Sequence, residues 1–423
     1  MNRFAIASIV VVLGLAAVVV ISGLSQSPAP ASAQDETSPG ATAPDSGATV
    51  PDRRPGQLDD PGEPRFSTRG WATNFDISAI PYDEILSGGV PKDGIPAVND
   101  PQFESIEEAR QWVTGKGPVI ALEIDGDARA YPLAVLTWHE IANDVVGGVP
   151  VTVTFCPLCH TALVYDRTLD GTVYDFGVSG NLRFSDLVMY DRQTETWWQQ
   201  ATGKGIVGDL TGAKLPFRAS QLIGLDQFAE AYPDGIVMSR DTGHRRDYGR
   251  NPYAGYDTPD QQPFLFAGVT DGRVAPKERV VTLGEQDGEA ISFPYTELRS
   301  TGVAQVEFEG EPVVVLWVPG AVSALNRSAI DESEDVGSTG VFSAVVDGDT
   351  LTFVRGGGED APITDVETGS TWDITGRAID GPLAGTTLEP IPHGDHFWFA
   401  WAAFVPETSI WTADGTIRLG EGA

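Results

Sequence analysis

The chain is poor in sulfur and in positive charge. Its 423 residues include only two Cys and 27 Lys+Arg, against 60 Asp+Glu, which gives a net charge of −33. Such an excess of negative charge repels the phosphates of nucleic acids and of anionic lipids, so neither is expected as a partner. An acidic balance of this kind suits a secreted protein or one that lives in salt.

The chain also lacks the sequence motifs of several enzyme classes. It has no phosphate-binding P-loop, no Rossmann glycine pattern in a βαβ setting, no Gly-x-Ser-x-Gly and no His-Glu-x-x-His. The sequence therefore gives no basis for assigning a nucleotide-dependent enzyme, a serine hydrolase or a metallopeptidase. It names neither a substrate nor a reaction, and whether the protein is an enzyme stays open.

Both cysteines lie in one short segment, Phe155-Cys156-Pro157-Leu158-Cys159-His160, between two apolar runs that favour strands. A Cys-x-x-Cys pair has few chemical uses. It can ligate a metal, exchange between dithiol and disulfide, form a local disulfide or, with a following His, attach haem. Every thiol of the chain is thus predicted to lie in a single turn.

The N-terminus has the pattern of a targeting segment. One positive charge precedes a largely apolar stretch over residues 4–24, and Ala31-Ser32-Ala33 has the small-x-small form of a cleavage site. Residues 1–33 are predicted to be a signal peptide or a retained membrane anchor, the only expected membrane contact. The protein would then be secreted or anchored to the outer face of the cell membrane. Residues 34–65, rich in Pro, Ala, Ser and Asp, are predicted to be a disordered linker.

The composition predicts a mainly β fold with a few short helices. The 48 Gly and 30 Pro indicate many turns, and short apolar runs are separated by Asp-Gly pairs typical of hairpins. These pairs begin at Asp125, Asp170, Asp287 and Asp347. Three segments favour helices: 105–113, which opens with a capping box, 133–145 and 227–232.

The chain also resembles itself. Residues 119–128 match 281–290 without a gap, at an offset of 162 residues (281 − 119 = 162). The match continues from 149–153 to 311–315 and from 162–163 to 324–325, and resumes at 196–198, 209–212 and 228–233 with a slightly larger offset. The shared positions are apolar residues and turn residues, which a fold needs. We predict two tandem copies of a related β-sheet domain, residues 66–262 and 263–423, of which the second is degenerate.

The two predicted copies differ at residues that carry chemistry. At the 162-residue offset the proline of the cysteine turn is retained, but both cysteines and His139 are replaced. The aligned pairs are Cys156 with Val318, Pro157 with Pro319, Cys159 with Ala321 and His139 with Thr301. The turn is thus predicted to persist in the second copy without its thiols. Residues needed only for folding should recur in both copies, so this difference indicates a functional site in the first.

Two thiolates need one or two further ligands to hold a metal ion. His139 and His244 are the candidates. Glu140, His160, Asp186 and Tyr248 are candidates for places around the metal, His160 also as a weaker ligand. His244 and Tyr248 belong to a long segment rich in Gly and Tyr, which fits either a functional loop or an interdomain linker.

Other clusters of polar or aromatic residues have plainer explanations. His393 and His396 fit a polar loop, and Asp186 and Asp191 fit solvated turn positions. The aromatic segments are predicted to belong to the core. They are Trp197-Trp198 and Phe397-Trp398-Phe399.

Several segments together resemble a known family. They include Leu136-Thr137-Trp138-His139-Glu140, Thr154-Phe155-Cys156-Pro157-Leu158-Cys159, Phe176-Gly177-Val178-Ser179-Gly180, Ser185-Asp186-Leu187 and Asp247-Tyr248-Gly249-Arg250-Asn251-Pro252-Tyr253. The chain is similar to the domain of unknown function 3179 (DUF3179) family of bacterial and archaeal proteins, over most of residues 80–260 and more weakly beyond. The resemblance implies no activity. Its pattern commonly has Gly in place of His160, so a role that requires His160 would not be shared across the family.

Four interpretations of the cysteine turn stay open. A metal centre is favoured, and zinc or copper suits sulfur and nitrogen ligands. Dithiol exchange is less favoured, because exchange motifs usually begin a helix and a strand is predicted to follow here. Haem is disfavoured for the same structural reason. In the last interpretation a local disulfide staples an extracytoplasmic structural or interaction protein.

Overall fold

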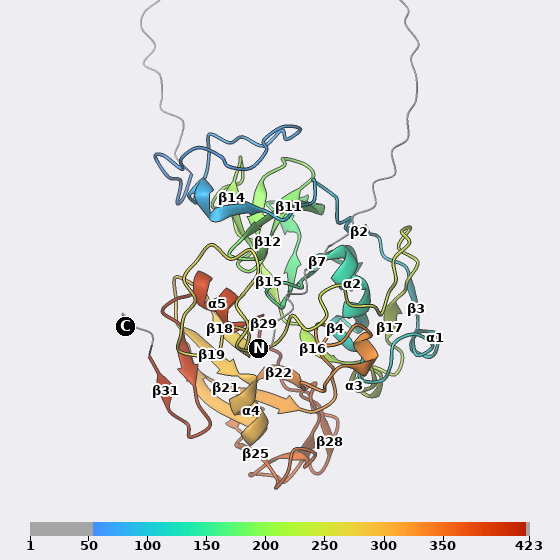
Figure 1. The fold of residues 1–423 in the computed structure, drawn as a ribbon. Helices are drawn as coiled ribbons and strands as arrows, with labels where there is room; N and C mark the ends of the chain where they lie inside the picture. The colour runs from blue at the N-terminus through green and yellow to red at the C-terminus, as the bar shows by residue number, and fades with distance from the viewer. Residues whose placement is uncertain (1–53, 420–423) are drawn as a thin grey trace, which may run out of the picture. The chain divides into compact units, whose positions relative to one another are not determined.

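The computed structural model describes residues 54–419, which form a β-rich fold with short helices, as the composition predicts (Figure 1). The predicted targeting segment, residues 1–33, lies outside the described residues, as does most of the predicted linker. Within the described part, no helix is both long and apolar enough to cross a membrane.

The predicted Asp-Gly pairs all lie between paired strands. Asp125-Gly126 joins β4 (Pro118–Ile124) to β5 (Asp127–Pro132), with φ of 51° and 86°. Glycine adopts this left-handed region freely and aspartate tolerates it, which is why such pairs form tight hairpins. Asp170-Gly171 and Asp347-Gly348 likewise join β9 (Thr168–Leu169) to β10 (Thr172–Val173) and β23 (Val345–Val346) to β24 (Asp349–Thr350). Asp287-Gly288 lies within the longer connection between β18 (Arg279–Gly284) and β19 (Ala290–Pro294).

The bounds of the helices differ from those that the sequence predicts, and α1 and α2 are shorter. Helix α1 (Ile106–Ala109) begins with the predicted capping box, formed by Ser105 and Glu108. Helix α2 spans only Leu133–His139, because Glu140 takes the left-handed conformation and ends it. The following residues form strand β6 (Ile141–Val146), so the helix predicted over 133–145 is wrong in its second half. Helix α3 (Leu225–Ala231) begins earlier than predicted.

Most of the remaining strands fall into two sets with the same order along the chain, which β4, β5, β9 and β10 join in the first half and β18, β19, β23 and β24 in the second. The first set is β6, β7 (Val149–Cys156), β8 (Thr161–Asp166), β11 (Phe176–Arg183), β12 (Asp186–Asp191), β13 (Trp197–Gln199), β14 (Lys204–Val207), β16 (Gln221–Gly224) and β17 (Ile236–Met238). The second set is β20 (Val303–Phe308), β21 (Glu311–Val318), β22 (Ser338–Ser343), β25 (Phe353–Arg355), β26 (Ile363–Asp365), β27 (Thr371–Trp372), β28 (Ala378–Asp380), β29 (Gly394–Phe397) and β30 (Ser409–Trp411). Helices α4 (Tyr295–Thr301) and α5 (Trp398–Phe404) take the places of α2 and α3.

A few short elements lie outside these two sets. They are the 3₁₀-helices η1 (Tyr82–Glu84) and η2 (Ile330–Glu332) and the strands β1 (Ile85–Ser87), β2 (Val98–Asn99), β3 (Phe103–Ser105), β15 (Phe217–Arg218) and β31 (Ile417–Arg418).

Strand pairing recurs between the two sets. In the first, β4 pairs antiparallel with β5 and β16, and β17 runs parallel to β5. In the second, β18 pairs antiparallel with β19 and β29, and β30 runs parallel to β19. The antiparallel series β11 to β14 likewise has its counterpart in β25 to β28. This recurrence is what a duplication requires, while the tandem arrangement itself stays a prediction.

The two sets share one large sheet. Ten strands belong to it, in the order β2-β6-β7-β8-β29-β18-β19-β30-β31, with β15 also paired to β8. Strands β8 and β29 meet at Ala162 and Asp395, which joins the first set to the second. The described residues accordingly form one compact unit. The cysteine turn, between β7 and β8, lies close to this junction.

The turn that follows β7 is not repeated in the second set. Four residues separate β7 from β8, whereas β21 ends at Val318 and β22 begins at Ser338, which leaves 19 residues between them (338 − 318 − 1 = 19). Strand β22, and not residues 324–325, therefore takes the place of β8. The predicted persistence of the cysteine turn is wrong, because a gapless comparison cannot locate an insertion.

The aromatic clusters are buried, as predicted, but the polar clusters predicted to be solvated are buried as well. The predicted core aromatics, Trp197, Trp198, Phe397, Trp398 and Phe399, are all buried. The four polar residues assigned to solvated turns or loops are buried too: Asp186, Asp191, His393 and His396. They belong to or directly precede strands whose neighbours cover them, so the solvated interpretation is wrong for each of them.

Asp191 and Asp365 form a matched pair on which the recurrence can be tested. Each accepts a hydrogen bond from a buried indole N–H at 2.9 Å, from Trp198 and Trp372 respectively. Replacing either aspartate with Ala leaves that N–H unpaired and should cost about 3 kcal/mol, whereas Asn keeps an acceptor and should cost less. Denaturant unfolding of the four variants measures this, and a large loss at one site with none at the other contradicts equivalent roles.

Candidate metal centre

The cysteine segment forms the tight turn between two central strands. Cys156 ends β7 and pairs with Thr161, the first residue of β8, and Cys159 lies within the turn. Both are free thiols, and their exposed fractions are 1% and 0%. Strand pairing on both sides fixes the turn, so the two sulfur atoms are held on the same short stretch of backbone.

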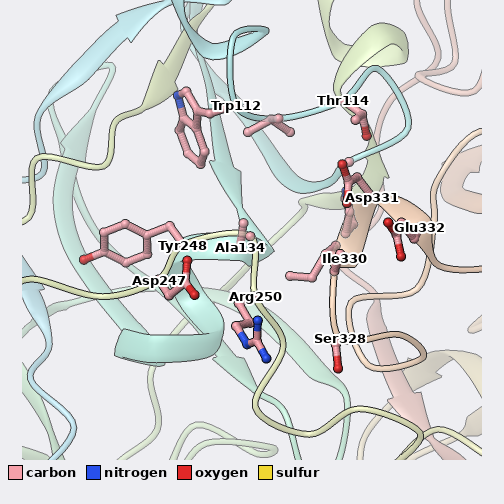
Figure 2. Close-up of a pocket in the computed structure, with 15 residues that line it drawn as sticks. Trp112, Thr114, Ala134, Asp247, Tyr248, Arg250, Ser328, Ile330, Asp331 and Glu332 are labelled. Atoms are coloured by element: carbon pink, nitrogen blue, oxygen red, sulfur yellow. The ribbon is translucent and has the colours of Figure 1, made fainter.

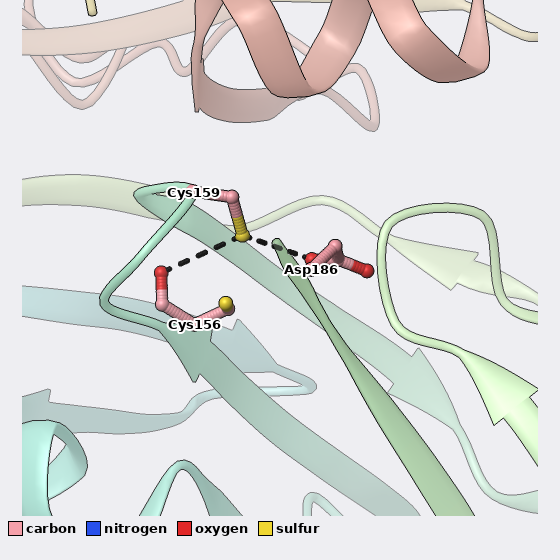
Figure 3. A group of neighbouring side chains, drawn as sticks. All are labelled: Cys156, Cys159 and Asp186. Carbon is pink, nitrogen blue, oxygen red and sulfur yellow. Dashed lines mark hydrogen bonds between the residues drawn. The ribbon is translucent and has the colours of Figure 1, made fainter. Parts of the chain in front are cut away.

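A carboxyl group from another sheet completes the cluster. Asp186 begins β12, directly after Phe184 and Ser185, which both have positive φ (51° and 66°) and turn the chain toward the cysteines. The Cys159 thiol donates to Asp186 Oδ1, with 2.9 Å between the atoms, as Figure 3 shows. One ligand atom from each of Cys156, Cys159 and Asp186 lies within 4.8 Å of the others.

The cluster is acidic, buried and without a cation. Burial raises the pKa of both thiols and raises that of Asp186 to about 6, although Gln199 and the backbone N–H of Ala201 donate to its second oxygen. Among residues 54–419, no Lys or Arg forms an ion pair with Asp186 or with nearby Glu140. The site therefore holds three acidic groups with nothing positive nearby to stabilise their charged forms.

Glu140 lies beside this cluster. It caps α2, and its backbone carbonyl accepts from the N–H of Phe155, the residue before Cys156. Its side chain is buried, and burial together with the nearby charge of Asp186 raises its pKa to about 8. A second buried carboxyl group thus lies beside the three acidic groups of the site.

The loop after β17 packs beside the thiols. Tyr253 and Tyr256 contact the hydrophobic core that contains both cysteines. On one side of the loop, Ser185 donates to the carbonyl of Phe264 at 2.6 Å. On the other, the N–H of Gly255 donates to the carbonyls of Leu325 and Asn326 at 3.0 and 2.8 Å. The loop thus ties Ser185, next to Asp186, to the segment inserted between β21 and β22.

The predicted histidine ligands lie in a different cluster. His139 uses both ring nitrogens elsewhere, with Nδ1 2.7 Å from the carbonyl of Pro96 and Nε2 2.7 Å from the hydroxyl of Tyr248. His244 is exposed, and its ring lies 5.5 Å from that of His139. Neither belongs to the group formed by the two cysteines and Asp186. The structure therefore brings His139, His244 and Tyr248 together, but as a separate cluster.

A surface cavity adjoins this histidine cluster. Its volume is about 390 Å³, and its lining includes Tyr248. Figure 2 shows Trp112, Asp247 and Tyr248 on one side of it and Asp331 and Glu332 on the other. Neither cysteine lines it. The cavity and the thiol cluster are therefore two separate features of the fold.

His160 makes no contact that would suit a ligand. Its ring is buried, stacks on Phe397 with 5.1 Å between centroids, and neither of its nitrogens has a hydrogen-bond partner among the described residues. Its φ of 53° lies in the region that favours glycine.

Comparison with known proteins agrees with the resemblance. The sequence model described as "Protein of unknown function (DUF3179)" matches residues 92–408. The chain belongs to the DUF3179 family. No curated protein and no solved structure matched it. Position 160 of this DUF3179 protein has left-handed backbone, which glycine adopts more readily than histidine.

From the sequence, Asp186 was expected around the metal but not among its ligands. Spacing along the chain cannot show that it meets Cys159, because 27 residues and a change of sheet separate them. One signal was present: Ser185-Asp186-Leu187 is among the segments that carry the DUF3179 resemblance. Together with the cysteine segment, this segment marks the two parts of the chain that form the cluster.

Proposed function

We propose that this protein is an exported metal-binding protein whose metal centre is built on Cys156, Cys159 and Asp186. One observation carries the proposal: two thiols and a carboxyl group lie within 4.8 Å of one another, fully buried and without a neighbouring cation. Buried acidic groups are normally paired or bound to a metal. A divalent ion would take the place of the thiol protons and balance the charge of the carboxylate.

Zinc fits this ligand set better than copper. Zinc binds both thiolate and carboxylate ligands in tetrahedral sites, whereas the softer copper(I) favours sulfur and gains little from a carboxylate. The burial of both cysteines also favours a closed site over an open one. We therefore favour a stabilising role, in which the ion connects the turn of the ten-stranded sheet to the five-stranded sheet that contains β12.

The alternative uses of the cysteines have less support. Dithiol exchange needs an accessible thiolate, but both thiols are buried, burial raises the pKa of each, and a strand follows the turn. Haem attachment needs room around both sulfur atoms and a free axial histidine, but the ring of His160 packs against Phe397. A local disulfide would leave Asp186 without the thiol that donates to it.

Export is the part of the proposal that depends on the sequence alone. The apolar stretch and small-x-small site in residues 1–33 support it.

Metal analysis of the full chain tests the proposed centre. The protein, purified without an affinity-tag metal, should contain zinc in stoichiometric amount, and Cys156→Ser or Cys159→Ser should lose it. His160→Gly is a matched control next to the ligands and should keep the metal. A wild-type protein that neither contains zinc nor takes it up from solution would rule out the centre, as would Cys variants with unchanged zinc content.

A further inference from the structure

We infer that Glu140 is the fourth metal ligand of this centre, beside Cys156, Cys159 and Asp186. The inference rests on the proposed metal function and adds to it, because three protein ligands leave one position of a tetrahedral ion open and a fourth closes it. Residue type does not set Glu140 apart from the chain's other glutamates, but its backbone conformation and burial do.

The backbone of Glu140 has a conformation that suits glycine. Glu140 ends α2 with φ of 60°, and Gly302 ends α4 with φ of 74°. Each donates its N–H to the carbonyl four residues earlier, and each is followed at once by a strand, β6 or β20. The junction between helix and strand thus needs a left-handed residue, which glycine provides without strain. A glutamate there is unfavourable for folding, which points to a use for its side chain.

The carboxylate of Glu140 lacks a partner. Only 7% of the residue is exposed, and no residue in the range 54–419 donates a hydrogen bond to the carboxylate. The charged group that acts on it is Asp186, which is also acidic. Burial without a donor or a cation disfavours the charged form of this group, so it keeps its proton until a metal ion displaces it. A metal ion bound by the three neighbouring ligands would supply the missing positive charge.

Ligation requires the Glu140 side chain to move. The carboxylate stands outside the group whose ligand atoms lie within 4.8 Å, so rotation about its side-chain torsions has to bring one oxygen to the ion. The four ligands would then come from the end of α2, the turn between β7 and β8, and the start of β12. One ion would connect a helix to strands of two different sheets.

Zinc titration of two Glu140 variants tests the inference. Glu140→Gln removes the charge and keeps the size, and Glu140→Gly introduces the residue found at position 302. Each should weaken zinc binding by about 100-fold, measured by competition with a chromophoric chelator. The metal-free Glu140→Gly protein should also unfold at a higher temperature than the metal-free wild type, because the left-handed strain is gone. Glu107→Gln, on the exposed face of α1, should bind zinc as the wild type does.

The outcomes separate this inference from the proposed function. If the wild type binds zinc and both variants bind it equally tightly, Glu140 is not a ligand and water fills the fourth position. If the wild type binds no zinc at all, the proposed centre itself is wrong. Weaker zinc binding in both variants, together with a more stable metal-free Gly variant, assigns the carboxylate to the metal and rules out a purely structural role.

Discussion

Zinc should raise the free energy of unfolding of this protein by about 4 kcal/mol when free zinc exceeds the dissociation constant a thousandfold. The reason is that the ligands assemble only in the folded chain. Cys156 and Cys159 come from one sheet and Asp186 from another, so unfolding separates them. Unfolding of the full chain by denaturant, with zinc and with a chelator, measures the difference.

Two comparisons make this prediction specific. The double variant Cys156→Ser and Cys159→Ser should unfold at the same denaturant concentration with and without zinc. Magnesium should not stabilise the wild type, because it prefers six oxygen ligands and binds thiolates poorly. Equal stabilisation by zinc of the wild type and the double variant would show that zinc acts at another place.

Local sequence predicted the β-rich character and the hairpin turns because both depend on neighbouring residues. An Asp-Gly pair carries its own backbone preference, and Asp125-Gly126 takes the expected left-handed conformation. The capping box at Ser105 was found for the same reason: its hydrogen bonds span only three residues. The family resemblance likewise depends on short segments.

Features that depend on distant contacts could not be predicted in this way. Asp186 looks like a turn residue along the chain, and only the pairing of β11 with β12 and the arrangement of sheets place it against Cys159. Helix α2 stops at His139 although the following residues extend its pattern, because β6 gains a full ladder of hydrogen bonds with β7. Tertiary pairing here outweighs local preference.

The comparison of the two halves was informative where elements align and misleading where the chain has an insertion. It matched α2 with α4 and β7 with β21, and this agreement makes Gly302 a reference for Glu140. It also matched the cysteine turn to residues that belong to a longer connection. The match of Glu140 with Gly302 therefore comes from helices that the structure also places in equivalent positions.

Acid should destabilise the protein between pH 6.5 and 4 through His139. The ring is fully buried, and burial is the main cause that lowers its pKa from 6.5 to about 4, with smaller contributions from His244 and Arg246. Nδ1 faces the carbonyl of Pro96 and must donate, so in the neutral ring Nε2 accepts from Tyr248. The unfolded chain takes up that proton below pH 6.5, and the folded chain only near pH 4.

The sign and size of the effect follow from this difference. Above pH 6.5 His139 is neutral in both the folded and the unfolded chain, so no stability is lost. Below pH 4 the loss in the free energy of unfolding is complete and amounts to about 3 kcal/mol. Replacing His139 with Gln should remove that part of the pH dependence, measured by denaturant unfolding at pH 7 and pH 4. His244→Gln is the matched control, because this exposed neighbour should leave most of the loss in place. If His139→Gln and the wild type lose the same stability between these pH values, protonation of His139 is not what acid acts on.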